Sequence, residues 1–527
     1  MSQGQSGAQP WRPSKNPWAV AMTVTLATFM EVLDTSIANV ALPHIAGSLS
    51  AGNDESTWVL TSYLVSNAIV LPISAWLCDR FGRKRFYMTC VLLFTLSSLM
   101  CGLSTTLPML IFFRILQGAG GGGLGPSEQA ILADTFPPEK RGMGFAMYGM
   151  AVVLAPAIGP TLGGWITDNY SWHWIFFINV PVGILSLFLT SRMVEDPPWI
   201  ADAQVRAKHT PVDYTGLALV AVGLGALQVV LDKGQREDWF ASTFIQCFTA
   251  FTVIGLVGFV LWELHEANPI LDLRLLKNTN FAVSNVLMFT LGWVLYGSTV
   301  LIPQFLQTVM GYTAELAGKA LSPGGLVVMA IMPLVGVLVG RVDPRKLIAF
   351  GFIALALSMF HMMSLYPGID FHTAMMYRIY QSVGLAFLFI PINTICYAGV
   401  RQEQNNQVSS MINLMRNLGG SFGISFVTTM LARGSQIHQS MLASHTVSSN
   451  PMSRLLQSLT GLYAGQNPSH ADASIRAHAQ VYGIMQQQAS VLAYRDTIAV
   501  MAFLIVAAMP LLLLARRPKP GAVSMGH

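Results

Sequence analysis

Charge is scarce in this sequence. Charged residues make up 10% of its 527 residues, whereas hydrophobic residues make up 53%. Soluble globular chains carry about 25% charged residues. The mean hydropathy of +0.52 agrees with this imbalance. The composition therefore excludes an ordinary soluble domain and predicts an integral membrane protein.

Cysteine is also rare, and its placement excludes two kinds of stabilising site. The five cysteines all fall within or at the ends of apolar runs, at Cys78, Cys90, Cys101, Cys247 and Cys396. None forms a CxxC pair or lies at metal-ligand spacing from a histidine, so neither a disulfide framework nor a metal site is expected. The first apolar run is too long for a cleavable signal peptide, so it should remain in the mature protein.

Nucleotide-binding motifs are absent from the sequence. The glycine-rich stretch at 118–125 is not followed by Lys-Ser/Thr, no strand precedes it, and it lies inside an apolar run. Close helix packing explains it better than phosphate binding. We therefore expect no enzyme activity and no bound cofactor.

Long apolar runs, in contrast, are abundant. A bilayer-crossing helix needs about 20 mostly apolar residues. Fourteen segments meet that requirement, near 18–42, 57–77, 85–104, 108–131, 142–166, 174–193, 213–231, 240–263, 280–307, 318–340, 346–366, 372–399, 407–432 and 492–515. Each is continuously apolar rather than alternating, which predicts an all-α polytopic membrane protein and not a barrel.

The basic residues predict the orientation of these spans. If the N-terminus is cytoplasmic, 20 of the 30 Lys and Arg residues fall in inner segments: Arg12, Lys15, Arg80, Arg83, Lys84, Arg85, Lys140, Arg141, Arg192, Arg206, Lys208, Arg274, Lys277, Arg341, Arg345, Lys346, Arg401, Arg516, Arg517 and Lys519. Cytoplasmic loops carry such an excess. Both termini, 1–17 and 516–527, are therefore predicted to be cytoplasmic.

An internal repeat predicts the domain plan. Arg114, Gln117 and Gly120 in the fourth span are matched by Arg378, Gln381 and Gly384 in the twelfth. Repeats of this kind build two-lobed secondary transporters. The plan is a six-helix lobe at 18–193, two inserted helices at 213–263 and a second six-helix lobe at 280–515.

The segment 433–491, between the last two spans, is unusually long for an outer loop. It is polar but contains amphipathic stretches at 453–463 and 473–489. Their apolar periodicity favours helices on the outer face, and a flexible linker is the alternative.

Ionisable residues inside the spans are the best functional candidates, because each costs about 2.5–3.5 kcal/mol to insert. Glu31 and Asp34 lie three residues apart on one face of the first span. Asp34 and Arg114 lie at the same expected depth, roughly 12–14 Å below the outer boundary. Desolvation favours a neutral carboxyl and a nearby arginine favours the ionised form, so this pair could load and release a proton. The alternative is a permanent ion pair that only locks helices. Glu31, nearer the middle of the span, is expected either to take part in proton coupling or to contact a cationic substrate.

Two further charged positions have less specific predictions. Glu128 is expected near the inner end of its span, paired with a loop arginine or reaching water. Arg378 and Arg416 are expected either to bind backbone carbonyls in the second lobe or to face a central cavity.

Three other groups of residues carry candidate roles. The turn after the second span, with Asp79, Arg80, Gly82, Arg83 and Lys84, predicts a charged latch that breaks when the lobes rock. The fifth span predicts close helix packing through Pro156, Gly159, Pro160, Gly163 and Gly164. A soft central cavity is expected to be lined by Asn39, Gln117, Phe281, Met288, Phe289, Trp293, Tyr296, Gln304 and Gln307, although the α-helical stripe among them could equally face lipid.

These residues resemble the motifs of the major facilitator superfamily, and more narrowly of its fourteen-span drug:proton antiporters. The stretch 33–43 matches that branch's first-span signature, and 79–84 matches the superfamily's loop motif, with Ala75 where glycine is usual. Arg114, Gln117 and Gly118 match the fourth-span motif. The glycines and prolines of 156–164 match the antiporter motif, with Ala146 and Ala155 in place of two glycines. The resemblance implies the major facilitator fold and proton transfer at the fourth-span arginine.

Within that branch the chain is most similar to EmrB/FarB-type pumps of Gram-negative inner membranes. The resemblance implies proton-driven export of hydrophobic or amphipathic drugs, with no cofactor beyond the proton gradient. It also implies a periplasmic adaptor of the EmrA type and an outer-membrane channel of the TolC type. Two alternatives remain: a dedicated exporter of a fatty acid, lipid or siderophore-like metabolite, and a membrane receptor or scaffold without transport.

Overall fold

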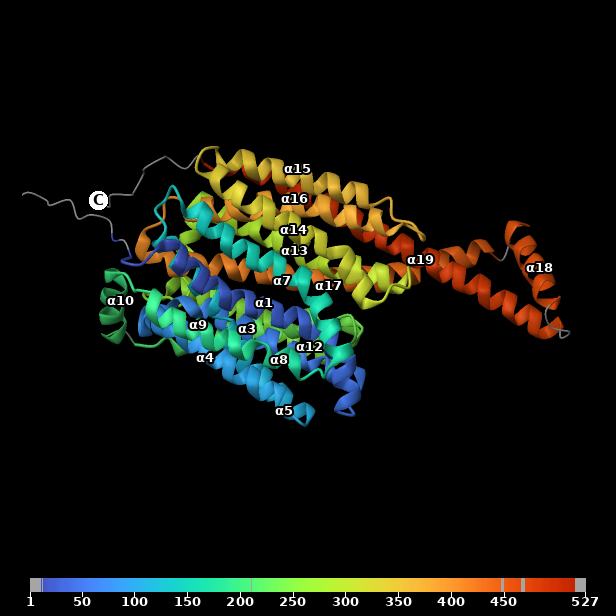
Figure 1. Ribbon diagram of the computed structural model, residues 1–527, viewed down its shortest axis with the longest axis horizontal. Coiled ribbons are helices and arrows are strands. Elements are labelled where there is room, and N and C mark those ends of the chain that lie inside the picture. Colours follow the sequence, from blue (N-terminus) through green and yellow to red (C-terminus); the bar gives the residue numbers. More distant parts are fainter. Residues whose placement is uncertain (1–10, 12, 210, 447–449, 466–469, 517–527) are drawn as a thin grey trace, which may run out of the picture.

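The protein is a bundle of long helices in the computed structural model (Figure 1). The model describes residues 11, 13–209, 211–446, 450–465 and 470–516. Every regular element in these ranges is helical. The basic residues Arg12, Arg517 and Lys519, and most of the two terminal segments, lie outside the described part of the chain.

The helices of the first half are α1 (Pro17–Ser48), α2 (Asn53–Ser56), α3 (Trp58–Phe81), α4 (Arg83–Gly102), α5 (Leu107–Gly121), α6 (Leu124–Thr135), α7 (Arg141–Asn169), α8 (Trp174–Phe177), α9 (Asn179–Met193), α10 (Pro198–His209), α11 (Tyr214–Lys233), η1 (Trp239–Ala241) and α12 (Thr243–His265). Those of the second half are η2 (Leu273–Lys277), α13 (Thr279–Thr308), α14 (Ala314–Val339), α15 (Pro344–Met362), α16 (Phe371–Cys396), η3 (Gln402–Gln404), α17 (Asn405–Thr446), α18 (Asn450–Ala464), α19 (His470–Ala508) and η4 (Met509–Leu514).

Thirteen helical segments of the described chain are long and apolar enough to cross a membrane. Their ends lie within a few residues of the predicted ends for the first twelve spans. The predicted thirteenth span, 407–432, lies within α17, which is long enough to cross but too polar to meet the same threshold. It nevertheless lies in the bundle, packed against α3, α13 and α19.

The helices form two lobes with an extra helix pair. In the first lobe α1 packs against α7 and α9, and α4 packs against α5 and α9. In the second lobe α13 packs against α17, and α16 lies between α14 and α15. The lobes meet where α7 contacts α14 and where α17 contacts α3 and α6. Figure 1 shows the second lobe above the first.

The extra pair, α11 and α12, packs through glycines. A Cβ added at Gly255 would lie 2.6 Å from the Gly223 Cα atom, so the two backbones touch. Helix α11 then contacts α3 of the first lobe and α17 of the second. On α17, the Ser421 hydroxyl donates to Gln228 Oε1 on α11 at 2.9 Å.

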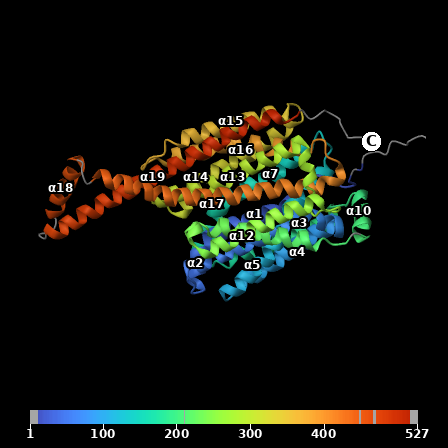
Figure 2. The same cartoon turned by 180° about the vertical axis from the view of Figure 1, so that it is seen from behind.

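The two ends of the bundle differ. Helix α10 lies at one end, which we call the α10 end, together with the α3–α4 turn. At the opposite end, the α18 end, the last part of α17, α18 and the first part of α19 project beyond the other helices (Figures 1 and 2).

This projection contains the described part of the segment 433–491, for which helices and a flexible linker were the two alternatives. The prediction of helices there is confirmed for its described residues, but only α18 is a separate helix. The helices α17 and α19 run on without interruption past the predicted span ends. Two contacts tie the projection together: Gln439 Nε2 donates to the Tyr482 hydroxyl, and the Tyr463 hydroxyl donates to Gln480 Oε1, both at 2.9 Å.

The charged cluster of the first lobe and its contacts with the second

Asp34 is the centre of a dry polar cluster in the first lobe. Its side chain is 1% exposed, and its Oδ2 atom accepts a hydrogen bond from Arg114 Nη1 at 2.6 Å. Its Oδ1 atom accepts from Gln117 Nε2 at 2.9 Å and from Asn179 Nδ2 at 2.7 Å. The donors come from α5 and α9, so one carboxylate on α1 joins three helices.

Arg114 has further partners besides Asp34. Its Nε donates to the Val59 carbonyl on α3 at 3.1 Å, and its Nη1 also donates to Gln117 Oε1 at 2.8 Å. The Tyr63 ring lies 4.2 Å from the guanidinium carbon, a cation–π distance. The equal depth predicted for Asp34 and Arg114 therefore corresponds to a direct ion pair, while the proton-carrying role of that pair stays a prediction.

Glu31 has a different set of partners from Asp34, although the two share a helix face. It accepts hydrogen bonds from the Tyr63 hydroxyl and from Asn67 Nδ2, each at 3.3 Å. It also interacts electrostatically with Arg416 on α17 of the second lobe. Asp34 therefore acts within one lobe, whereas Glu31 lies where the lobes meet.

Arg416 is bound from the first lobe. Its Nη1 atom donates to the Tyr148 hydroxyl on α7 at 2.6 Å. The Tyr148 hydroxyl donates in turn to Asn413 Oδ1 on α17. The expectation that Arg416 binds carbonyls within its own lobe is wrong for this contact, because α17 presents it to α7.

A chain of amides continues between the lobes. Asn413 Nδ2 donates to Gln129 Oε1 on α6, and Gln129 Nε2 donates to Asn393 Oδ1 on α16. Gln129, Asn393 and Asn413 were not predicted from the sequence. Their signal was available, since an amide inside an apolar span needs a hydrogen-bond partner, but only the amides of the first, fourth and ninth spans were selected.

Glu128 does not lie where the sequence placed it. Its side chain is completely buried, and its Oε1 atom accepts a hydrogen bond from the Thr25 hydroxyl on α1 at 2.7 Å. It is not paired with a loop arginine in the structure.

The predicted latch residues lie at the α10 end and join the two lobes. Arg83 forms an ion pair with Asp134 on α6 at 2.6 Å, with both side chains 2% exposed. Arg83 Nε also donates to Asn406 Oδ1 at the start of α17 at 2.8 Å. Asn406 Nδ2 donates to Asp79 Oδ1, and Asn405 Nδ2 donates to Asp134 Oδ1, both at 2.6 Å. The sequence analysis did not select Asp134, Asn405 or Asn406.

Gly82 and the residues beside it are held by the segment after α9. Gly82 has φ of +92°, a conformation that residues with side chains rarely adopt, and it lies against the Gln204 side chain of α10. Arg80 Nη1 donates to the Ala207 carbonyl on α10 at 2.9 Å. Lys84 Nζ donates to the Ser191 carbonyl at 2.8 Å. Helix α10 was not predicted, because its twelve residues are too polar to count as a span.

Asp196, just before α10, adds one more contact to the turn between α3 and α4. Its Oδ1 atom accepts a hydrogen bond from the backbone N–H of Lys84 at 2.9 Å. Burial raises the pKa of the Asp196 carboxyl above its usual 3.8, against the opposing effects of that hydrogen bond and of Arg83.

Of the three predicted motif glycines of α7, two pack against α1. A Cβ at Gly159 would lie 2.3 Å from Ser36 Oγ, and one at Gly163 would lie 3.0 Å from Ile37 Cγ2. Gly164 has no atom within 4 Å of that position, so the predicted close packing is wrong for Gly164. Helix α7 continues through both Pro156 and Pro160.

The predicted cavity stripe on α13 packs mainly against α17. The rings of Phe289 and Trp293 contact Phe422, and Trp293 also contacts Phe426. Phe281 and Met288 are buried in the core, whereas Asn39 and Gln307 are exposed. Gln304 is half-buried, and the Tyr296 ring packs against Gly420 of α17. The residues selected from sequence therefore do not line one common cavity.

Gln117 and Arg378 also depart from the expected cavity. Gln117 belongs to the Asp34 cluster. Arg378 on α16 donates from Nη1 to Gln381 Oε1 at 2.6 Å and to the Ser298 hydroxyl at 3.5 Å. Neither is a backbone carbonyl, so the alternative role for Arg378 is also wrong for these contacts.

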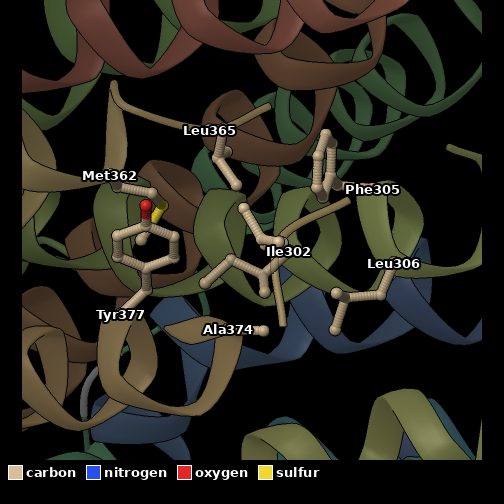
Figure 3. A pocket seen from close by; sticks show the side chains of 8 residues that line it. Ile302, Phe305, Leu306, Met362, Leu365, Ala374 and Tyr377 are labelled. Atoms are coloured by element: carbon tan, nitrogen blue, oxygen red, sulfur yellow. The ribbon is translucent and has the colours of Figure 1, made fainter. Parts of the chain in front are cut away.

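A small apolar pocket lies inside the second lobe. It is lined by side chains of α13, α15 and α16 and of the segment between the last two, as Figure 3 shows for Ile302, Phe305, Met362, Leu365 and Tyr377. None of the residues that the sequence analysis assigned to a cavity lines it.

The sequence model of the Major Facilitator Superfamily matches residues 24–424, which include every cluster described above. The chain belongs to the Major Facilitator Superfamily. It is therefore a multi-pass membrane protein of a transporter superfamily, with two six-helix lobes and two inserted helices.

Several known members of the superfamily are similar to this chain. The multidrug export protein EmrB of Escherichia coli (strain K12) is 39% identical over 459 residues, which is 86% of this chain and 88% of EmrB. The fatty acid resistance protein FarB of Neisseria gonorrhoeae is 36% identical over 504 residues, 95% of this chain and 96% of FarB.

Solved structures support the same fold. The superfamily proton:xylose symporter XylE bound to 6-bromo-6-deoxy-D-glucose superposes with a TM-score of 0.59, covering 95% of this chain and 99% of XylE at 14% identity. A bacterial homologue of the lysosomal transporter Spinster gives a TM-score of 0.52 at 18% identity, covering 97% of each chain.

Within this major facilitator chain, the geometry limits what the charged cluster can do. Protonation of Asp34 would remove the negative charge from Arg114 while leaving the guanidinium buried. A buried ion pair broken in this way is strongly unfavourable unless the surroundings rearrange. Protonation of Asp34 would therefore disfavour the present arrangement of α1, α5 and α9.

Proposed function

We propose that this protein is a proton-driven exporter of hydrophobic or amphipathic compounds that works by alternating access. The observation that carries the proposal is the buried Asp34 carboxylate with its three donors, Arg114, Gln117 and Asn179. The similarity to EmrB, a multidrug export protein, supports export of drugs.

The coupling follows from how α1 is connected. Ionised Asp34 holds α1 against α5 and α9. When Asp34 takes up a proton this attraction falls, and α1 is free to shift relative to both. Since α1 packs on α7 through Gly159 and Gly163, and α7 packs on α14, a shift of α1 reaches the second lobe. Glu31, on the same helix and facing Arg416, gives a second route between the lobes.

The latch sets the direction of access in this conformation. Arg83, Asp134, Asn405 and Asn406 close the α10 end. We propose that the α10 end faces the cytoplasm, because the loops there carry the basic residues expected on that side. The protein then lies in a bacterial inner membrane with both termini cytoplasmic and the α18 end in the periplasm.

The test of coupling is Asp34→Asn in proteoliposomes with an imposed pH gradient. We expect the variant to lose uphill export of a hydrophobic dye and the dye-dependent proton flux, because an asparagine side chain cannot take up and release a proton as a carboxylate does. Asp168→Asn removes an exposed carboxylate on α7 and serves as the matched control. Wild-type pumping by Asp34→Asn would contradict the role of Asp34. Absence of dye-dependent proton flux in the wild type would instead favour the non-transporting receptor.

The projection at the α18 end is the proposed docking surface for a periplasmic adaptor of the EmrA type, leading to a channel of the TolC type. It exposes large apolar side chains, among them Leu455, Leu462, Ile475, Tyr482 and Ile484. Apolar groups gathered on a water-facing surface are typical of interaction sites.

Serine at Leu462, Ile475 and Ile484 should abolish co-purification of the adaptor while export in vesicles continues. Alanine at the exposed Gln486 and Gln488 is the control on the same projection. Retained adaptor binding in the serine variant would exclude this surface.

A dedicated exporter of a fatty acid or similar metabolite is the second candidate function. The similarity to FarB, a fatty acid resistance protein, over 95% of the chain favours it. Transport of a panel of cationic, neutral and anionic compounds separates the two.

A further inference from the structure

A cleft lies between the inserted helix pair and the first lobe, at the end of the bundle where α2 is found (Figure 2). It has a volume of about 370 Å³, within the range of about 300–1,000 Å³ that is typical of ligand sites. Its lining residues are Glu55, Trp58, Lys233, Arg236, Glu237 and Phe244. They lie at or next to the ends of α3, α11 and α12, all of which are long and apolar enough to cross a membrane. The cleft is therefore at the depth where lipid headgroups begin.

Two of the lining residues are cations. Lys233 is 5% exposed, and its ammonium donates to the Thr57 hydroxyl and lies 4.7 Å from the centre of the Trp58 ring. A lysine at the end of a span ordinarily extends its charge into water. Lys233 instead stays in the wall of the cleft, and Arg236 follows three residues later with an exposed side chain. An ammonium and a guanidinium are the groups with which proteins bind phosphate.

Two carboxylates line the same cleft. Glu55 comes from α2 and Glu237 from the turn after α11, and both side chains are exposed. The charges of the lining residues are therefore balanced, with two of each sign. A ligand that carries only negative charge would be repelled by the carboxylates, whereas a zwitterion finds an opposite charge for each of its groups.

An aromatic row leads from the cleft along α12. The Phe244 ring lies 4.6 Å from that of Phe248, and Phe248 lies 6.4 Å from Phe251, measured between ring centres. These positions share one face of the helix. Phe244 is 37% exposed and Phe251 is 53% exposed, so the row faces lipid in a membrane protein. It begins in the charged cleft and continues into the apolar part of the span, which is the arrangement that a headgroup with an attached acyl chain requires.

We propose that the cleft binds a phospholipid whose headgroup contains both a phosphate and a primary ammonium. The phosphate accepts hydrogen bonds from Lys233 and Arg236, and the ammonium donates to Glu55 and Glu237. One acyl chain lies along the three phenylalanines of α12. Such a lipid joins α2 and α3 of the first lobe to the inserted pair. This inference goes beyond the proposed export function and does not depend on transport.

Native mass spectrometry of the purified full-length protein measures the preference. The protein is exposed to an equimolar mixture of phosphatidylethanolamine, phosphatidylcholine and phosphatidylglycerol with identical acyl chains. We expect the wild type to retain phosphatidylethanolamine about tenfold better than either of the others. The choline headgroup has no N–H to donate, and the glycerol headgroup has no cation. The double variant Lys233→Met, Arg236→Gln should lose this preference.

A second double variant distinguishes recognition from misfolding. Glu55→Gln with Glu237→Gln removes both negative charges from exposed positions while preserving side-chain shape. We expect its preference to reverse in favour of phosphatidylglycerol, a gain that a misfolded protein does not produce. Glu139→Gln, at an exposed position of the α10 end, is the control and should bind lipids as the wild type does.

Three results would overturn the proposal. They are equal retention of the three lipids by the wild type, an unchanged preference in the glutamine double variant, and an equal change in the Glu139→Gln control. A further arm uses soluble glycerophosphoethanolamine, which has the same headgroup without acyl chains. If it binds as tightly as the lipid, the cleft takes a free zwitterion and the assignment to a lipid is wrong. The measurement involves no proton flux, so failure of the Asp34 test leaves the lipid site standing.

Discussion

The two acidic residues of α1, Asp34 and Glu31, lie one helical turn apart but have different neighbours. Asp34 forms an ion pair with Arg114 inside the first lobe, whereas Glu31 lies within electrostatic range of Arg416 of the second. The distance between the two lobes can therefore change the surroundings of Glu31 while those of Asp34 stay intact. Under the proposed function, Asp34 would have the local role and Glu31 would sense the lobe arrangement.

Asp196 provides a residue-scale prediction about pH. Burial raises the pKa of this carboxyl above 3.8, so the folded state favours its neutral form. The stability it contributes is fully present below its unfolded pKa and is lost as pH rises through the raised folded pKa. Asp196→Asn cannot ionise, and its amide oxygen can still accept from the Lys84 N–H.

Thermal unfolding in detergent between pH 3.5 and 7 measures this effect. We expect Asp196→Asn to gain stability relative to the wild type as pH rises from 3.8, and then to level off above the raised pKa. Asp196→Ala should instead lose about 0.5–2 kcal/mol, because a first-turn N–H of α4 loses its partner. A difference between Asp196→Asn and wild type that is flat or falls with pH would contradict the assignment.

At the scale of single elements, α7 has two glycine positions with opposite surroundings. Gly159 lies against Ser36 of α1, where an added methyl group would overlap Ser36 Oγ, and Gly164 faces open space. Both are inside the same helix, so alanine gains the same backbone propensity, about 1 kcal/mol, at each.

We expect Gly164→Ala to be neutral or stabilising and Gly159→Ala to destabilise by about 1–3 kcal/mol through overpacking. Melting temperatures of the two purified variants give the comparison. Export should fall in Gly159→Ala alone, because its contact transmits motion of α1 to α7. Equal melting temperatures for the two variants would show that α1 and α7 do not pack as described.

At the scale of the whole molecule, the lobes are joined at the α10 end by few but charged contacts. Asn405 and Asn406 of α17 hydrogen-bond to Asp134, Asp79 and Arg83. Hydrogen bonds to charged groups contribute about 1.5–3 kcal/mol each. Their loss should shift the balance between closed and open α10 ends by at least tenfold.

Spin labels at the exposed positions of Lys140 and Glu403, one in each lobe, report the distance between the lobes at the α10 end in nanodiscs. We expect the double variant Asn405→Ala, Asn406→Ala to increase the population with longer label distances. Gln402→Ala, an exposed neighbour, is the control. An unchanged distance distribution would mean that other contacts close this end.

The sequence by itself determined the class of fold. Runs of apolar residues fix which segments cross the bilayer, because backbone groups in lipid must be satisfied within a helix. The first twelve spans were accordingly predicted to within a few residues. Its motifs selected Asp34, Arg114 and Arg83, since charges in apolar runs stand out without any knowledge of their partners. The polar helix α10 was not predicted, and the predicted spans within α17 and α19 are shorter than these helices. The reason is that hydropathy identifies only segments apolar enough to cross lipid.

Tertiary structure alone decided which of these residues meet. Asp134, Asn406, Tyr148 and Asn413 have ordinary identities and lie far from their partners in the sequence. Their importance comes from the packing of α6, α7 and α17. It also decided that Gly164 is free where Gly159 is not, and that Arg378 has no carboxylate where Arg114 has one. Whether two residues form a contact depends on where both lie in space. The periodicity of the sequence indicates only which face of its helix each residue occupies.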